Sequence, residues 1–214
     1  MTTKQSTSNI KIGVLALQGA FEEHVTMMTK LGVDTCEIRN PEELEGLHGI
    51  IIPGGESSTI SLVAEEWKLV DPLKKWVTEG RPVFGTCAGM IFVSKDAKNQ
   101  KKHGQTLLGK LDIVVDRNHF GRQKFSFEGK VNTELDDKEH SGIFIRAPGI
   151  LSVGKDVKIL GTIEHGDKKD MAVAVQQGSI LATCFHPELT EDELWHTYFL
   201  KIVKDSKISK PFTA

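Results

Sequence analysis

A cysteine within a Gly-x-Cys-x-Gly pentapeptide is the residue best placed to do chemistry. Cys87 lies in Gly85-Thr86-Cys87-Ala88-Gly89, between a short apolar run and a second apolar segment. This pattern is typical of a nucleophile elbow, in which a strand turns sharply into a helix and pushes the central side chain outward. The helix N-terminus would favour a thiolate, and the N–H of Ala88 would face an oxyanion. The alternative is a structural cysteine buried between helix and sheet.

A histidine and a carboxylate two residues apart offer a base for this thiol. His186 and Glu188 flank Pro187 after an apolar run at 180–184. Residues i and i+2 of an extended segment point to the same face, so Glu188 could accept a hydrogen bond from one imidazole nitrogen. The other nitrogen would then be free to face a thiol. Three other histidines could serve as the base instead, namely His24, His119 and His165.

The same segment has two further interpretations. His186 could be a partly buried histidine at a strand end, with Glu188 at the start of a helix. Cys184, His186 and Glu188 also alternate onto one face and could ligate a metal. The sequence shows no second cluster to complete a shell of four ligands, so we expect no metal.

A glycine pair after another apolar run suggests a second oxyanion donor. Gly54 and Gly55 lie in Pro53-Gly-Gly-Glu-Ser-Ser58, between a β-branched run at 49–52 and a helical pattern. Glycine permits backbone conformations that other residues do not tolerate, and it lets a peptide N–H approach a ligand closely. The alternative is a plain strand-to-helix turn with a serine N-cap. It is not a phosphate loop, because the spacing and lysine of that motif are missing.

Two arginines close to strand ends suggest recognition of a carboxylate. Arg117 lies in the polar stretch 116–123, and Arg146 follows the apolar residues 143–145. A guanidinium can bind a carboxylate through two parallel hydrogen bonds. Each arginine taken singly is more readily explained by a surface ion pair, since such pairs are common.

The elements that must position these residues follow an alternating order. Apolar runs predict strands at 10–17, 33–38, 49–52 and 82–85, while helical spacing predicts helices at 20–31, 57–66, 72–79 and from Met90. After Gly109 the pattern changes to short segments in which apolar and polar residues alternate. These predict strands at 111–115, 125–131, 142–145, 157–163, 171–176 and 180–185, followed by a helix at 191–203. This order predicts an α/β fold with a central mixed sheet and helices on both faces.

Composition narrows the class of protein further. The chain has 214 residues and a formal net charge of -2, which fits one domain and argues against a nucleic-acid surface. No apolar run approaches the ~18 residues that cross a membrane. The chain has three cysteines, a small and odd number that does not suit a disulfide framework, so we expect a reducing, cytoplasmic compartment. Polar composition predicts a disordered tail at 1–9, a single domain at 10–204, a C-terminal tail at 205–214 and a surface loop at Lys95–Gln105.

Three motifs in this order give the chain a resemblance to a known family. Gly-Thr-Cys-Ala-Gly, Phe-His-Pro-Glu-Leu-Thr and Pro-Gly-Gly-Glu-Ser-Ser resemble class I (triad) glutamine amidotransferases. The segments at 15–24, 117–123 and 144–148 resemble the glutaminase subunits of pyridoxal 5'-phosphate synthases. The resemblance covers about 10–203 and implies a three-layer α/β/α, flavodoxin-like fold with a mostly parallel mixed sheet. Lys95–Gln105 departs from it in being longer and more basic.

The resemblance also implies a function. Members of this family hydrolyse L-glutamine to L-glutamate and ammonia, and pass the ammonia to a separate (β/α)8-barrel synthase subunit. Cys87 would be the nucleophile, His186 the base and Glu188 its orienter, with no cofactor. The substrate-binding positions would be Gly55, Glu56, Ser57, Arg117, Ile145 and Arg146.

Three other functions remain open on these residues. The chain could be a stand-alone thiol hydrolase of γ-glutamyl compounds, or an amidotransferase subunit for another pathway. It could also be a catalytically silent regulatory subunit that keeps the fold only to bind a partner.

Overall fold

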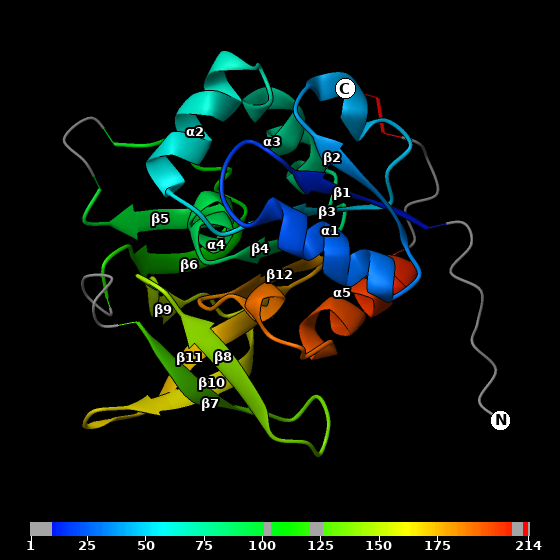
Figure 1. The fold of residues 1–214 in the computed structure, drawn as a ribbon. Coiled ribbons are helices and arrows are strands. Elements are labelled where there is room, and N and C mark those ends of the chain that lie inside the picture. The colour runs from blue at the N-terminus through cyan, green and yellow to red at the C-terminus, as the bar shows by residue number, and fades with distance from the viewer. Residues whose placement is uncertain (1–9, 101–103, 120–125, 207–211, 214) are drawn as a thin grey trace, which may run out of the picture.

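A nine-stranded mixed sheet forms the centre of the molecule, and a second sheet has three strands (Figure 1). The structure is a computed structural model that describes residues 10–100, 104–119, 126–206 and 212–213. The strand order in the large sheet is β2-β1-β3-β4-β12-β11-β10-β7-β8. The first five strands of this order run parallel, and the remaining pairs are antiparallel.

The parallel half confirms the apolar runs that the sequence predicts as buried strands. Its strands are β2 (Asp34–Ile38), β1 (Lys11–Leu15), β3 (Gly49–Ile52), β4 (Val83–Thr86) and β12 (Ile180–Thr183). Every residue of β3, β4 and β12 is buried, as expected of strands covered by helices on both faces.

Helices cover both faces of this parallel half, which confirms the three-layer α/β/α prediction. Their bounds are Phe21–Lys30 for α1, Ser57–Glu66 for α2, Val70–Thr78 for α3, Ala88–Val93 for α4 and Leu194–Asp205 for α5. Phe84 of β4 packs against Phe199 of α5, with ring centroids 5.7 Å apart. The neighbouring Gly85 faces α4, because a Cβ there would lie 2.8 Å from the backbone of Gly89.

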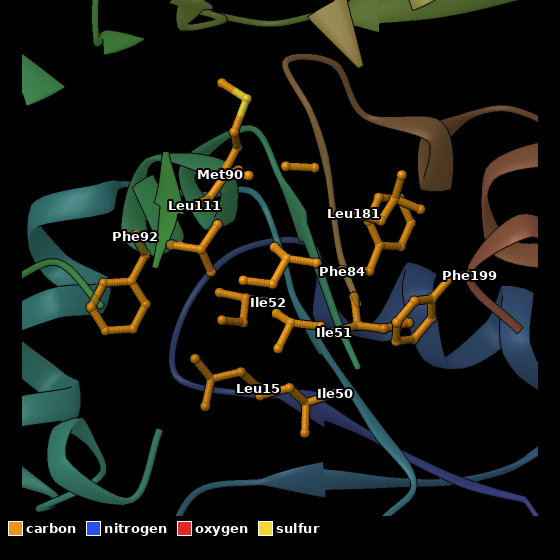
Figure 2. Close-up of a cluster of buried hydrophobic side chains, with 14 of the residues drawn as sticks. Leu15, Ile50, Ile51, Ile52, Phe84, Met90, Phe92, Leu111, Leu181 and Phe199 are labelled. Carbon is orange, nitrogen blue, oxygen red and sulfur yellow. The ribbon is translucent and has the colours of Figure 1, made fainter. Parts of the chain in front are cut away.

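Aliphatic and aromatic side chains fill the space between these layers. Figure 2 shows Ile50, Ile51 and Ile52 of β3 beside Phe84 and Leu181 of the next two strands. All five are fully buried. Burial of such a continuous apolar core is the main contribution that holds the strand ends, and therefore the candidate site, in place.

Apart from β5, the strands of the antiparallel half and of the small sheet lie after Gly109. The antiparallel strands are β11 (Lys168–Gln177), β10 (Lys158–His165), β7 (Phe127–Thr133) and β8 (His140–Phe144). The small sheet contains β5 (Ser94–Lys98), β6 (Leu111–Asp116) and β9 (Gly149–Val153). Two 3₁₀ turns complete the described elements, η1 at Pro41–Leu44 and η3 at Pro187–Leu189.

Two elements of the small sheet differ from the sequence prediction. The prediction of a surface loop at Lys95–Gln105 is wrong for the first part of that segment. The strand β5 lies there instead, pairs in parallel with β6 and buries Ala97. Residues 101–103 of that segment lie outside the described residues. The strand β9 was not predicted. Its sequence is short and largely exposed, so it carries little strand pattern of its own, and it is a strand because it pairs with β6.

The two predicted tails have different outcomes. Residues 1–9 lie outside the described residues. At the other end α5 extends to Asp205, and Phe212 is buried with its ring centroid 5.0 Å from that of Trp76. Part of the predicted C-terminal tail is therefore packed on α3. No helix in the described parts of the chain is long and apolar enough to span a bilayer.

Candidate active site

Cys87 occupies a strained turn between β4 and α4. Its φ is +48° and its ψ is −103°, a conformation that non-glycine residues adopt rarely and that recurs at functional sites. Gly89 allows this turn to pack tightly, because a Cβ there would lie 1.9 Å from the carbonyl oxygen of Ile52 in β3. The strand–turn–helix that the pentapeptide predicts is therefore present, with Cys87 as the N-cap of α4.

His186 lies against Cys87 and is oriented by Glu188. The imidazole Nδ1 is 2.7 Å from Oε1 of Glu188, and the ring also hydrogen-bonds with the Cys87 side chain. The backbone N–H of His186 donates to the carbonyl of Ile143 in β8 at 2.9 Å, which anchors the residue to the sheet. The segment is not extended as predicted, because Pro187–Leu189 forms the 3₁₀ turn η3. The turn still brings the carboxylate back to the ring.

The charges in this group support one another. Burial opposes protonation of His186, but Cys87 and Glu188 outweigh it and raise the pKa of the imidazole to about 10. Burial likewise opposes ionisation of Glu188, but His24 and the hydrogen bond from His186 hold the pKa of the carboxyl below its usual value. The arrangement therefore favours an imidazolium at His186, placed between Cys87 and an ionised Glu188.

The other residues considered as bases lie elsewhere. His119 packs under Gly149, where a Cβ would meet its ring at 2.2 Å, and His165 stacks on Phe127 with ring centroids 4.6 Å apart. His24 is fully buried on the far side of Glu188, with Nε2 3.4 Å from Oε2 of that carboxylate. These three histidines are absent from the residues that line the cavity at Cys87.

Cys184, the third member of the metal alternative, is fully buried, and its Sγ lies 3.9 Å from Sδ of Met90. Burial raises the pKa of its thiol. Among the described residues no three His, Cys, Asp or Glu side chains are grouped so that they could hold a metal ion.

The glycine pair lies beside the imidazole. Gly54 and Gly55 line the same cavity as Cys87, and the carbonyl of Gly54 accepts a hydrogen bond from the N–H of Ala20 at 3.1 Å. Neither glycine has a positive φ, so the reason for glycine differs from the sequence argument. A Cβ at Gly54 would lie 2.2 Å from Cε1 of His186. Glycine is needed here to leave room for the base.

Arg117 organises the polar side of the cavity. Its Nε donates to Oγ of Ser57 at 3.2 Å, and its Nη2 donates to Oγ of Ser58 at 3.1 Å. Nη2 also lies 3.2 Å from Oε1 of Glu56, whose other oxygen accepts from the N–H of Thr59 at 2.8 Å and caps α2. One cation and one anion are thus held side by side at the start of α2.

Ile145 and Arg146 form the opposite wall. Sγ of Cys87 lies 3.9 Å from the carbonyl oxygen of Ile145. Arg146 is exposed and has a φ of +47°, the second strained non-glycine residue in this cavity. This backbone conformation turns the chain between β8 and β9, and Ile145 and Arg146 both line the cavity.

These residues enclose one cavity of about 430 Å³. Gly54, Gly55, Glu56, Ser57, Cys87, Ala88, Arg117, Ile145, Arg146 and His186 all line it. Glu188 does not, because it lies behind His186 and is 6% exposed.

Sequence reasoning missed six residues that line the cavity, namely Gln18, Gly19, Ala20, Ile91, Asn118 and Leu189. Gln18 accepts a hydrogen bond from the N–H of Glu56 at 2.6 Å and so holds the glycine loop. It follows β1, just as the loop follows β3, Cys87 follows β4 and His186 follows β12. The rule that ligands bind at the carboxyl ends of parallel strands could have identified it.

The segment 95–105 also reaches this site. Oγ of Ser57 donates to Oε1 of Gln105 at 3.1 Å, and the N–H of Thr106 donates to Oγ of Ser61 at 2.9 Å. The described end of this segment is therefore attached to α2 instead of being a free surface loop.

Comparison with known proteins agrees with this geometry. The family model of the SNO glutamine amidotransferase family matches residues 14–205. The chain is 43% identical to a probable pyridoxal 5'-phosphate synthase subunit PDX2 of Arabidopsis thaliana, over 91% of this chain and 86% of that protein. It is 43% identical to the pyridoxal 5'-phosphate synthase subunit PdxT of Bacillus cereus, over 94% of this chain and 98% of that protein.

A solved structure supports the same assignment. A crystal structure of a glutamine amidotransferase is 44% identical, covers 90% of this chain and 98% of its own, and superposes with a TM-score of 0.81. The resemblance drawn from the motifs and the predicted fold class are both confirmed. The chain belongs to the SNO glutamine amidotransferase family.

Proposed function

We propose that this chain is the glutaminase subunit of a pyridoxal 5'-phosphate synthase. It hydrolyses L-glutamine to L-glutamate and ammonia, and the ammonia goes to a separate synthase subunit with a (β/α)8-barrel fold. The names of its relatives and its family support this assignment. The observation that carries the chemistry is Cys87 in a strained elbow, against an imidazole that Glu188 orients at 2.7 Å.

In the first half of the reaction, Cys87 attacks the side-chain carbonyl of glutamine. The developing oxyanion is held by the N–H of Ala88 and by an N–H of the Gly54–Gly55 loop. His186 gives its proton to the leaving nitrogen, so ammonia departs and a γ-glutamyl thioester with Cys87 remains.

In the second half, water hydrolyses the thioester. His186, now neutral, takes a proton from the water as it attacks, and the thiolate of Cys87 leaves. Glu188 keeps the imidazole in one tautomer and stabilises the imidazolium that is consumed in the first half and forms again in the second. Glutamate then departs and the starting state is restored.

The paired charges at the start of α2 suit the other end of the substrate. Glutamine carries an α-carboxylate and an α-ammonium, and Arg117 and Glu56 present opposite charges 3.2 Å apart in the same cavity. We assign the arginines to the carboxylate and Glu56 to the ammonium. Gly55, Ser57 and Ile145 complete the walls of this pocket.

Cys87→Ala tests the triad. The variant should fold normally and release no ammonia, measured as glutamate and ammonia produced from glutamine with the synthase subunit present. A glutamine-analogue electrophile should label the wild-type chain at Cys87 and leave the variant unlabelled. Undiminished ammonia release by the variant would refute the assignment.

The partner is tested by the same assay with and without the synthase subunit. Strong activation by that subunit supports the proposed function. Full activity of the chain alone would instead favour a stand-alone hydrolase of γ-glutamyl compounds. Absence of both activity and Cys87 labelling in the complex would favour a silent regulatory subunit.

A further inference from the structure

The carboxylate of Glu188 has one oxygen that the proposed triad does not use. Oε1 receives the hydrogen bond from His186, but Oε2 is buried and has no hydrogen-bond partner within the usual geometric limits among the described residues. A buried charged oxygen without a donor is destabilising, so the group that faces it matters. That group is His24 of α1, whose Nε2 lies 3.4 Å away.

His24 belongs to a buried row of polar side chains behind the site. Its Nε2 is 3.1 Å from Oγ1 of Thr86, the residue before the nucleophile, and its Nδ1 is 2.9 Å from Nε2 of His196 in α5. His24, Thr86 and His196 are all fully buried. The ring of His24 therefore contacts β4, which ends just before Cys87, and faces the 3₁₀ turn η3, which contains Glu188.

The contacts of His24 favour the tautomer with the proton on Nε2. A lone pair on Nε2 would face the carboxylate oxygen 3.4 Å away and repel it, whereas an Nε2–H can be shared between that oxygen and Oγ1 of Thr86 at 3.1 Å. We therefore assign the hydrogen to Nε2, and Nδ1 then accepts from the N–H at Nε2 of His196. This leaves Nδ1 of His196 as an unprotonated acceptor, which agrees with its lack of a partner among the described residues. Orphaned buried N–H donors are rarer than acceptors without a full set of partners.

We propose, on the basis of the triad proposed above, that His24 is a positioning residue for the reaction. Its Nε2–H faces Oε2 of Glu188, keeps that carboxylate ionised and holds it in line with His186. The titratable groups that bear on the pair are His186, His196 and Glu23. Burial holds the pKa of His24 below its ordinary value, so near neutral pH it acts as a neutral donor.

Two substitutions separate hydrogen bonding from packing. His24→Leu keeps the buried volume and removes the donor, so kcat should fall about 10- to 100-fold with KM for glutamine nearly unchanged. His24→Gln returns an amide N–H near the Nε2 position and should restore kcat to within about threefold of wild type. Both are assayed in the complex with the synthase subunit.

Phe199→Leu is the matched control. It removes a fully buried ring of the same helix, α5, whose ring contact is with Phe84 of β4, so kcat should stay within about threefold of wild type. The proposal is overturned if His24→Leu keeps full kcat. It is also overturned if His24→Gln is as slow as His24→Leu, or if Phe199→Leu is as slow as either.

A measurement on the unaltered chain keeps the proposal testable if a variant does not fold. In ¹⁵N-histidine NMR spectra of the folded protein, His24 should show a protonated Nε2 and a bare Nδ1. A protonated Nδ1 would overturn the proposal. These outcomes are independent of the triad itself, which Cys87→Ala and the labelling of Cys87 test separately.

Discussion

Gly54→Ala should disable the site by displacing the imidazole of His186. The added methyl carbon would lie 2.2 Å from Cε1 and 2.8 Å from Nδ1 of the ring, whereas ordinary contacts begin at 3.4 Å. The ring or the loop must therefore move by about 1.2 Å. His186 cannot move freely, because Glu188 holds its Nδ1 at 2.7 Å and Ile143 holds its backbone N–H at 2.9 Å.

A displacement of this size has a large catalytic effect and a moderate effect on stability. Misplacement of a catalytic group by about 1 Å costs on the order of 100-fold in rate, so kcat should fall by about that factor. Overpacking of this kind costs about 1–3 kcal/mol, so the variant should remain folded. The assay is steady-state glutamine hydrolysis in the complex, together with thermal unfolding of the chain alone.

Gly46→Ala provides a matched control. Gly46 has a φ of +71°, and a Cβ there would meet no atom within 4 Å. The substitution should cost about 1–3 kcal/mol through backbone strain and leave kcat unchanged. If Gly54→Ala keeps kcat within about threefold of wild type, the loop can yield without moving the base, and the reasoning from the 2.2 Å contact is refuted.

Three further predictions concern substrate binding, pH and the C-terminus. Arg117→Lys loses the forked contacts to two serines of α2, so KM for glutamine should rise about 10-fold or more while kcat changes little; an unchanged KM would exclude Arg117 from binding. Burial opposes protonation of His140, but two flanking aspartates outweigh it and raise its pKa. The contribution of protonated His140 to stability is therefore complete below pH 6.5 and is lost as the pH rises through its raised pKa. In urea titrations above pH 6.5 the free energy of unfolding should therefore decline less steeply for His140→Gln than for wild type. Phe212→Ala removes a buried ring beside Trp76 and should cost about 3 kcal/mol in the same titrations, with kcat unchanged; a smaller loss than 1 kcal/mol would mean that the C-terminal contact contributes little.

Local patterns in the sequence were sufficient for the strands and helices of the parallel half and for the central chemical group. The run 49–52 is a glycine followed by three buried isoleucines, a composition typical of a strand covered on both faces. The pentapeptide around Cys87 contains its own turn, since small neighbours and a following helix are local requirements. His186 and Glu188 were paired correctly because they lie two residues apart, although the turn between them is 3₁₀ and not extended.

The tertiary structure decided which distant residues complete the site. His24 and His196 are 172 positions apart, yet their rings hydrogen-bond behind Glu188 because α1 and α5 cover the same face of the sheet. The need for glycine at position 54 arises from the ring of His186, which another strand brings to the loop. Gln105 reaches the site because Ser57 hydrogen-bonds to it, and β5 is a strand because it pairs with β6. Periodicity and short motifs report the conformation of neighbouring residues, whereas these contacts depend on how the layers pack, and that information lies in no single segment of the chain.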